Sequence, residues 1–219
     1  AINALMPFSN GVLSATTAFG KTVTAAALIA RRKTNTLILV HSKALLMQWH
    51  ERLSEFLGID FTEDEISKKR GRKKAFSPVG CLDSTSNTLH GVIDIALMQS
   101  CFENDEVKPF VKGYGMVIVD ECHHVSSITF ENVLKHVTAH YVYGLTATPI
   151  RKDGLQPIIF MQCGPIRFSA DAKAQIQKQS FQRYLVPRFT SYRPVTDDKQ
   201  SFTALSQSLA ESEIRNNLI

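Results

Sequence analysis

The sequence has 219 residues, of which 44% are hydrophobic and 21% charged, and its formal net charge is +5 at pH 7. A chain of this length can bury a substantial apolar core, so it fits one domain with an appendage. It contains no apolar run of about eighteen residues, the length that a membrane-spanning helix needs, and its first residues lack a signal-peptide pattern. From these properties we expect a soluble protein with a cytoplasmic location rather than a membrane protein.

The basic character is concentrated in one short segment. Residues 68–74 hold six of the 25 Lys and Arg residues, namely Lys68, Lys69, Arg70, Arg72, Lys73 and Lys74, so the rest of the chain sums to −1. Such a segment can bind a nucleic-acid backbone by displacing counterions, or it can be a solvated loop. The sequence leaves both interpretations open.

The four cysteines, at positions 81, 101, 122 and 163, are widely spaced and form no Cys-x-x-Cys pair. This spacing argues against a zinc site or a disulfide framework. We therefore expect free thiols.

Apolar runs of strand length alternate with segments of helical periodicity along the first two thirds of the chain. The runs predict strands at 11–14, 36–41, 92–97, 116–119 and 141–145, and the periodicity predicts helices at 22–32, 44–57 and 129–137. This alternation indicates an α/β fold with a parallel sheet covered on both faces. Farther along, residues 157–161 and 183–192 suggest extended segments, and 202–219 suggests an amphipathic helix.

The segment between the first strand and the first helix has the pattern of a phosphate-binding P-loop. It reads Ala15-Thr16-Thr17-Ala18-Phe19-Gly20-Lys21-Thr22. Gly20 allows the backbone to approach a phosphate, Lys21 brings a positive charge, and the Thr22 hydroxyl can ligate Mg²⁺. The pattern predicts ATP and Mg²⁺ as ligands, and a glycine-rich turn with a solvated lysine is the alternative.

Two carboxylates, Asp120 and Glu121, follow the predicted strand 116–119. They would emerge at the C-terminal edge of the sheet, where ligands bind in open α/β folds. Asp120 would hold Mg²⁺, and Glu121 would orient or deprotonate the attacking water. The alternative is an acidic turn at a strand end.

Three motifs in this order resemble those of superfamily two helicases and translocases. They are the P-loop, Asp120-Glu121-Cys122-His123-His124, and Thr146-Ala147-Thr148-Pro149. The resemblance covers roughly the first 165 residues and is to the first RecA-like domain of DEAD/DEAH-type proteins. Residues 144–154 are most similar to bacterial restriction and repair translocases.

This resemblance implies a RecA-like P-loop NTPase fold with a mostly parallel sheet, and it implies a role for each motif. Lys21, Asp120, Glu121 and His123 would be catalytic, with His123 linking the carboxylates to the third motif. Thr146 and Thr148 would couple the nucleotide site to the nucleic-acid site. Judged from their own chemistry alone, His123 is a strand-end histidine and the two threonines are turn formers.

The resemblance also implies two contacts with a nucleic-acid backbone. One involves His41, Ser42 and Lys43, and the other involves Met98, Gln99 and Ser100. Ser42 could equally be the N-cap of the helix 44–57, and Trp49 is expected in the core. Contacts with sugar and phosphate carry no base specificity, and the family favours DNA over RNA.

The chain departs from the family pattern in the P-loop and in the segments that it is expected to lack. Relatives have Pro-Thr-Gly where this chain has Thr16-Thr17-Ala18, and they carry an upstream adenine-recognition segment that we expect to be missing. We expect the RecA-like domain at 1–165 and an extension at 166–219 that leads to a missing second RecA-like domain. Such a fragment would be monomeric, and it would hydrolyse ATP slowly because a partner arginine contributes about 10³–10⁵ in rate.

The leading hypothesis is therefore the ATPase motor domain of a helicase or translocase. A P-loop module that binds nucleic acid or protein without hydrolysis is the alternative, although the intact Lys21, Asp120 and Glu121 disfavour it. A P-loop kinase would not explain residues 146–149.

Overall fold

The structure is a computed structural model that describes residues 1–16, 19–57, 79–123, 128–148, 156–170, 184, 186–187, 189 and 202–217. The chain forms two compact units, Ala1–Ile176 and Gln177–Ile219. The first unit contains every motif named above, although parts of these motifs lie outside the described residues.

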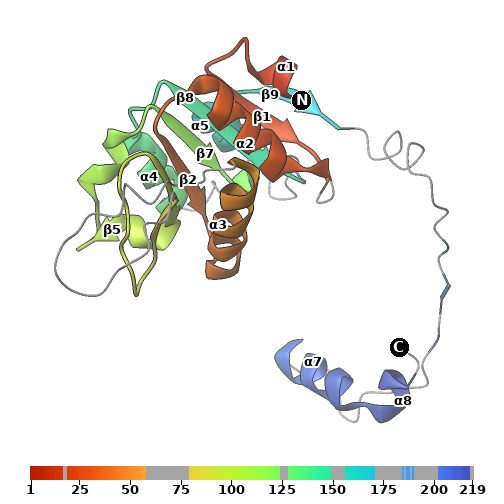
Figure 1. Cartoon of the computed structure of the whole chain (residues 1–219). Helices are drawn as coiled ribbons and strands as arrows, with labels where there is room; N and C mark the ends of the chain where they lie inside the picture. The colour runs from red at the N-terminus through yellow and green to blue at the C-terminus, as the bar shows by residue number, and fades with distance from the viewer. Residues whose placement is uncertain are drawn as a thin grey trace. The chain divides into compact units, whose positions relative to one another are not determined.

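A seven-stranded parallel sheet forms the centre of the first unit, with strand order β3-β4-β2-β7-β8-β1-β9 (Figure 1). The strands are β1 (Asn10–Ser14), β2 (Thr36–Val40), β3 (Gly80–Leu82), β4 (Ile93–Leu97), β7 (Met116–Val119), β8 (Tyr141–Thr146) and β9 (Ile166–Ser169). Every residue of β2 and β7 is buried, as continuous apolar runs require in a sheet covered on both faces. The predicted α/β fold with a parallel sheet is confirmed.

Helices cover both faces of this sheet (Figure 1). On one face lie α1 (Ile2–Leu5), α2 (Lys21–Arg32) and α3 (Lys43–Leu57), and on the other lie α4 (Ile128–His136) and α5 (Gln156–Cys163). Neighbouring strand residues alternate between the two cores: Ile38 packs with the α2 and α3 side, whereas Leu37 and Leu39 pack with the α4 and α5 side. This alternation follows from the two-residue period of a strand.

The segment 157–161 is helical, so the prediction of an extended segment there was wrong. It belongs to α5, in which Ile159 and Cys163 are buried while Met161 is 82% exposed. This burial follows helical spacing, and Pro157 is tolerated because it lies in the first turn. A short apolar run cannot distinguish a strand from a helix by composition alone.

Several other features were not predicted, among them α1 and β3. Two short strands, β5 (Phe102–Glu103) and β6 (Glu106–Val107), pair antiparallel around Asn104 and Asp105, which both have positive φ. A two-residue hairpin turn of this kind favours Asn and Asp. Short 3-10 helices also occur at η3 (Met98–Cys101) and η4 (Pro109–Gly113). The sheet extends beyond residue 165, because β9 pairs with β1.

The second unit contains α7 (Phe202–Glu211) and α8 (Glu213–Asn216). The predicted terminal helix is therefore divided at Ser212, whose side chain accepts a hydrogen bond from the Arg215 N–H and caps α8. Most of the predicted extended segment 183–192 lies outside the described residues. In the parts of the chain that the structure describes, no helix combines the length and apolarity needed to cross a membrane.

All four cysteines are free thiols, as expected. Burial raises the pKa of Cys81 to about 11 and that of Cys101 to about 12, so both remain protonated at neutral pH.

Candidate functional site

Five parallel strands end at one edge of the sheet, and each is followed by residues of a predicted site. In the strand order, β7 lies between β2 and β8. We call the residues that follow β1, β7 and β8 the P-loop side, and those that follow β2 and β4 the β2–β4 side. The topology therefore brings motifs that are far apart in sequence to one edge, as open α/β sheets do for their ligands.

On the P-loop side, the chain turns from β1 into α2 through a glycine in the left-handed region. Gly20 has φ 90° and ψ 41° and is the N-cap residue of α2. A side chain there would be strained, so glycine is required by the backbone. The first turn of α2 contains no acidic residue, so its N–H groups and dipole can attract an anion. Thr22 is half-buried in this turn, whereas Thr17 and Ala18 lie outside the described residues.

Lys21 points from the start of α2 towards the carboxylates that follow β7. Its Nζ lies 3.3 Å from Glu121 Oε1 and 3.4 Å from the Ala15 carbonyl oxygen, and its side chain is only 8% exposed. A buried ammonium needs such partners, because removing a charge from water is costly. The structure thus brings Lys21 and Glu121 together although 100 positions separate them.

Asp120 is a buried carboxylate with one hydrogen-bond donor for each oxygen. Its Oδ2 accepts the indole N–H of Trp49 at 2.7 Å, and its Oδ1 accepts the Glu121 backbone N–H at 3.0 Å. Burial raises the pKa of Asp120, and the Trp49 hydrogen bond opposes that rise.

Glu121 has φ 47°, in the left-handed region that is rare for residues with a side chain. Its Oε1 contacts Lys21, while its Oε2 is buried and has no hydrogen bond to any described group, although His123 Nδ1 lies 3.2 Å away. An unsatisfied buried oxygen marks a place where a water or another donor can be accommodated. Strained backbone at this position is consistent with a functional constraint.

Thr146 connects the third motif to the other two. Its Oγ1 lies 3.0 Å from His123 Nδ1 and accepts the Thr148 backbone N–H at 3.1 Å, and its carbonyl accepts the Ala15 N–H at 2.9 Å. Thr146 is fully buried and Thr148 is exposed. Lys21, Glu121, His123 and Thr146 therefore form one continuous polar network, with Asp120 beside it.

On the β2–β4 side, the polar residues that follow the two strands are exposed or half-buried. Ser42 Oγ accepts the Leu45 N–H at 3.3 Å, so Ser42 is the N-cap of α3. Lys43 Nζ lies 2.9 Å from Asp83 Oδ2 and donates to Thr85 Oγ1 at 3.3 Å. Lys43 first, and then Thr85, which donates to Asp83 Oδ1 through its hydroxyl and its backbone N–H, lower the pKa of Asp83 below its usual range.

The η3 turn contains the residues that were predicted to make the second nucleic-acid contact. Gln99 is exposed, and its amide donates to the His41 carbonyl oxygen at 3.4 Å, which joins the two loops. Ser100 is half-buried, whereas the Met98 side chain is completely buried in the core. Met98 can therefore contribute only its backbone to such a contact. His124, Pro149 and the basic segment 68–74 lie outside the described residues.

Sequence reasoning placed Trp49 in the core but missed its hydrogen bond to Asp120, and it missed Asp83 and Thr85 as partners of Lys43. One signal was available for Trp49, because a buried indole N–H usually finds an acceptor. Nothing in the local sequence around Asp83 indicates which cation it pairs with.

Comparisons with known proteins show what this chain is similar to. Residues 2–151 match the family described as "Type III restriction enzyme, res subunit". The chain is 33% identical over 165 residues to "Putative helicase 109L" of Invertebrate iridescent virus 3, an alignment that covers 75% of this chain and 47% of the relative. It is 28% identical over 223 residues to "DNA 3'-5' helicase XPB" of Kineococcus radiotolerans, covering 96% of this chain and 37% of the relative.

Among solved structures, the UvsW helicase of bacteriophage T4 has the same fold, with a TM-score of 0.57 at 16% identity, covering 77% of this chain and 58% of that one. The chain thus spans half or less of the length of the two relatives by sequence.

Proposed function

Because this chain belongs to the family described as Type III restriction enzyme, res subunit, and has the first RecA-like domain of a superfamily two helicase, we propose that it binds ATP and Mg²⁺ as part of a nucleic-acid motor. The proposal rests mainly on the contact between Glu121 and Lys21, the lysine of the P-loop. The two residues belong to different motifs, and each has the chemistry that phosphoryl transfer requires.

The chain's own residues suggest how binding and hydrolysis would be linked. Lys21 would exchange the Glu121 carboxylate for the β- and γ-phosphates of ATP. Glu121 would then be released to orient or deprotonate the attacking water, and His123 would remain near its second oxygen. Thr146 and Thr148 would couple this change to the nucleic-acid site, since Thr146 contacts both His123 and the P-loop strand.

Thr22 and Asp120 have the oxygen donors that suit Mg²⁺. This ion takes a few protein oxygens, with waters and phosphate oxygens completing its octahedron. Thr22 lies in the first turn of α2, and Asp120 is a buried carboxylate beside the P-loop network. Mg²⁺ would neutralise charge on the phosphates when bound.

We further propose DNA as the nucleic acid, bound by the β2–β4 side. His41, Ser42, Lys43, Gln99 and Ser100, with the backbone of Met98, would contact phosphates there. Lys43 offers an exposed cation, and the relative in Kineococcus radiotolerans is named as a DNA helicase. A second RecA-like domain would be the other partner, in keeping with the greater length of the relatives.

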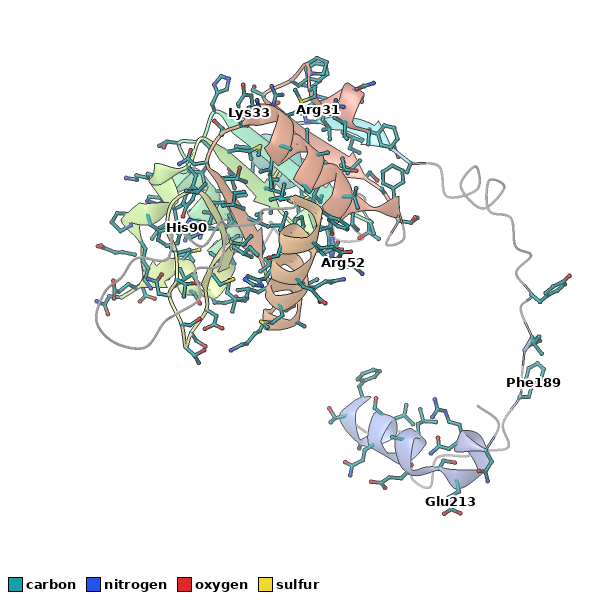
Figure 2. The ribbon with its side chains drawn as sticks, viewed as in Figure 1. Arg31, Lys33, Arg52, His90, Phe189 and Glu213 are labelled. Atoms are coloured by element: carbon teal, nitrogen blue, oxygen red, sulfur yellow. The ribbon has the colours of Figure 1, made fainter. Side chains whose placement is uncertain are left out.

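The experiment compares Lys21→Ala with Arg31→Ala in the 219-residue chain. Both variants remove one cation from α2, but Arg31, which is labelled in Figure 2, lies in the last turn of the helix, whereas Lys21 is its first residue. Isothermal titration calorimetry with a non-hydrolysable ATP analogue and Mg²⁺ should show an affinity lower by about 100-fold for Lys21→Ala, the size of one strong charge-assisted hydrogen bond. Arg31→Ala should bind as the unchanged chain does. Equal affinities for all three proteins would refute ATP binding at this P-loop.

A further inference from the structure

We propose that Trp49 is a positioning residue that holds Asp120 in place for the metal ion, an inference that rests on the proposed Mg²⁺-nucleotide site. Trp49 lies on α3 and is 2% exposed, and it is the only tryptophan in the chain. Its indole N–H donates to Asp120 Oδ2 at 2.7 Å, a short distance for an N–H donor and typical of a charged acceptor.

Two donors from different elements fix the Asp120 carboxylate. Trp49 holds Oδ2 from α3, and the Glu121 backbone holds Oδ1 from the end of β7. Because each donor takes a different oxygen, the carboxylate plane cannot rotate freely about the Cβ–Cγ bond. Each oxygen keeps lone-pair capacity for a metal-bound water or for the ion itself.

The contact differs from ordinary core packing in its choice of acceptor. A buried indole N–H needs some acceptor, and a backbone carbonyl would serve the fold equally well. Here the acceptor is the one carboxylate that the P-loop chemistry requires for Mg²⁺. Groups that hydrogen-bond to a metal ligand typically change metal affinity by about 10–100-fold when they are removed.

The first test is Trp49→Phe in the 219-residue chain, which removes the N–H and keeps an aromatic ring. Calorimetry measures the affinity for a non-hydrolysable ATP analogue across a Mg²⁺ series and in EDTA. Mg²⁺ should increase the affinity for the analogue, and we expect the Mg²⁺ concentration that gives half of this increase to rise about tenfold in Trp49→Phe. The affinity in EDTA should be unchanged. A purely structural role would lower both affinities together or neither.

Leu53→Ala is the matched control, because Leu53 is fully buried on the same helix, one turn from Trp49. It should destabilise the fold while leaving the Mg²⁺ dependence intact. If Trp49→Phe folds, as judged by circular dichroism, and shows the Mg²⁺ dependence of the unchanged chain, the proposal is wrong.

A second test uses the unchanged chain and does not depend on the folding of the Phe variant. Since Trp49 is the only tryptophan, indole emission reports on this one contact. Adding Mg²⁺ to the chain already saturated with the analogue should change the emission, and Asp120→Ala should abolish that response. An unchanged emission, where calorimetry shows Mg²⁺-dependent binding, overturns the positioning role.

The outcomes for Trp49 and for the proposed function can be separated. If Lys21→Ala weakens nucleotide binding but neither Trp49 test responds to Mg²⁺, only the positioning role fails. If the unchanged chain shows no Mg²⁺-dependent nucleotide binding at all, both proposals fail.

Discussion

The two sides of the sheet edge differ in how their polar groups are held. On the P-loop side, Lys21, Asp120 and Thr146 are buried and linked through Glu121 and His123. On the β2–β4 side, Lys43 has a side chain that is 57% exposed. Catalysis of phosphoryl transfer needs preorganised groups in a site with little water, whereas binding to a nucleic-acid backbone needs cations that phosphates can reach. The difference in burial therefore matches the two tasks proposed for one edge.

The largest expected effect is a difference in the free energy of unfolding between two Thr→Val variants, one on each side of the sheet edge. Thr146→Val removes a buried hydroxyl that accepts the Thr148 N–H and contacts His123, so we expect a loss of about 2 kcal/mol in the free energy of unfolding. Thr85→Val removes an exposed hydroxyl that contacts Asp83 and the Lys43 of the β2–β4 side, so its effect should stay within about 0.5 kcal/mol. Urea denaturation measures both values. Losses of equal size would contradict the contrast in burial.

A smaller effect on stability should show whether Ser42 acts as the N-cap of α3 or contacts a nucleic-acid phosphate directly. Ser42→Ala removes the N-cap of α3 and should cost about 1 kcal/mol in urea denaturation. Ser42→Asn keeps a capping oxygen and should restore that stability. If affinity for single-stranded DNA falls in Ser42→Ala and recovers in Ser42→Asn, Ser42 acts by holding the loop. A loss in both variants points instead to a direct phosphate contact.

The smallest effect is the pH-dependent part of the stability that Asp83 contributes through its contacts with Lys43 and Thr85. The folded chain lowers the pKa of Asp83, so this group contributes stability above the usual Asp pKa of about 4 and loses that contribution as the pH falls further. The stability difference between the unchanged chain and Asp83→Ala should therefore be present at pH 7 and shrink below about pH 4. It should also shrink at high salt, because Lys43 is exposed. A difference that grows in acid would reverse the assigned direction.

Local patterns predicted the central part of this fold well, and they failed where the answer depends on distant contacts. The buried strands β2 and β7 follow from continuous apolar runs, and α2 and α3 follow from helical spacing. The helix α5 was misassigned because its short apolar segment fits either structure until the burial of Ile159 and the exposure of Met161 are known.

For the candidate site, strand ends indicated which residues meet but not how they pair. That Lys21 and Asp120 share an edge follows from the parallel topology. The hydrogen bond from Trp49 to Asp120 spans 71 positions, and the pairing of Lys43 with Asp83 depends on how β3 is aligned against β4. No local period encodes such pairings.

The outer strands of the sheet also bear on self-association. β3 has only three residues, and β9 shifts its register against β1 between Val12 and Leu13. β9 carries Arg167, whose guanidinium lies 3.6 Å from the centre of the Phe8 ring. Short, irregular and charged outer strands are poor templates for pairing with another chain. Among the residues that the structure describes, both outer strands of the sheet are thus unfavourable places for another chain to add a strand.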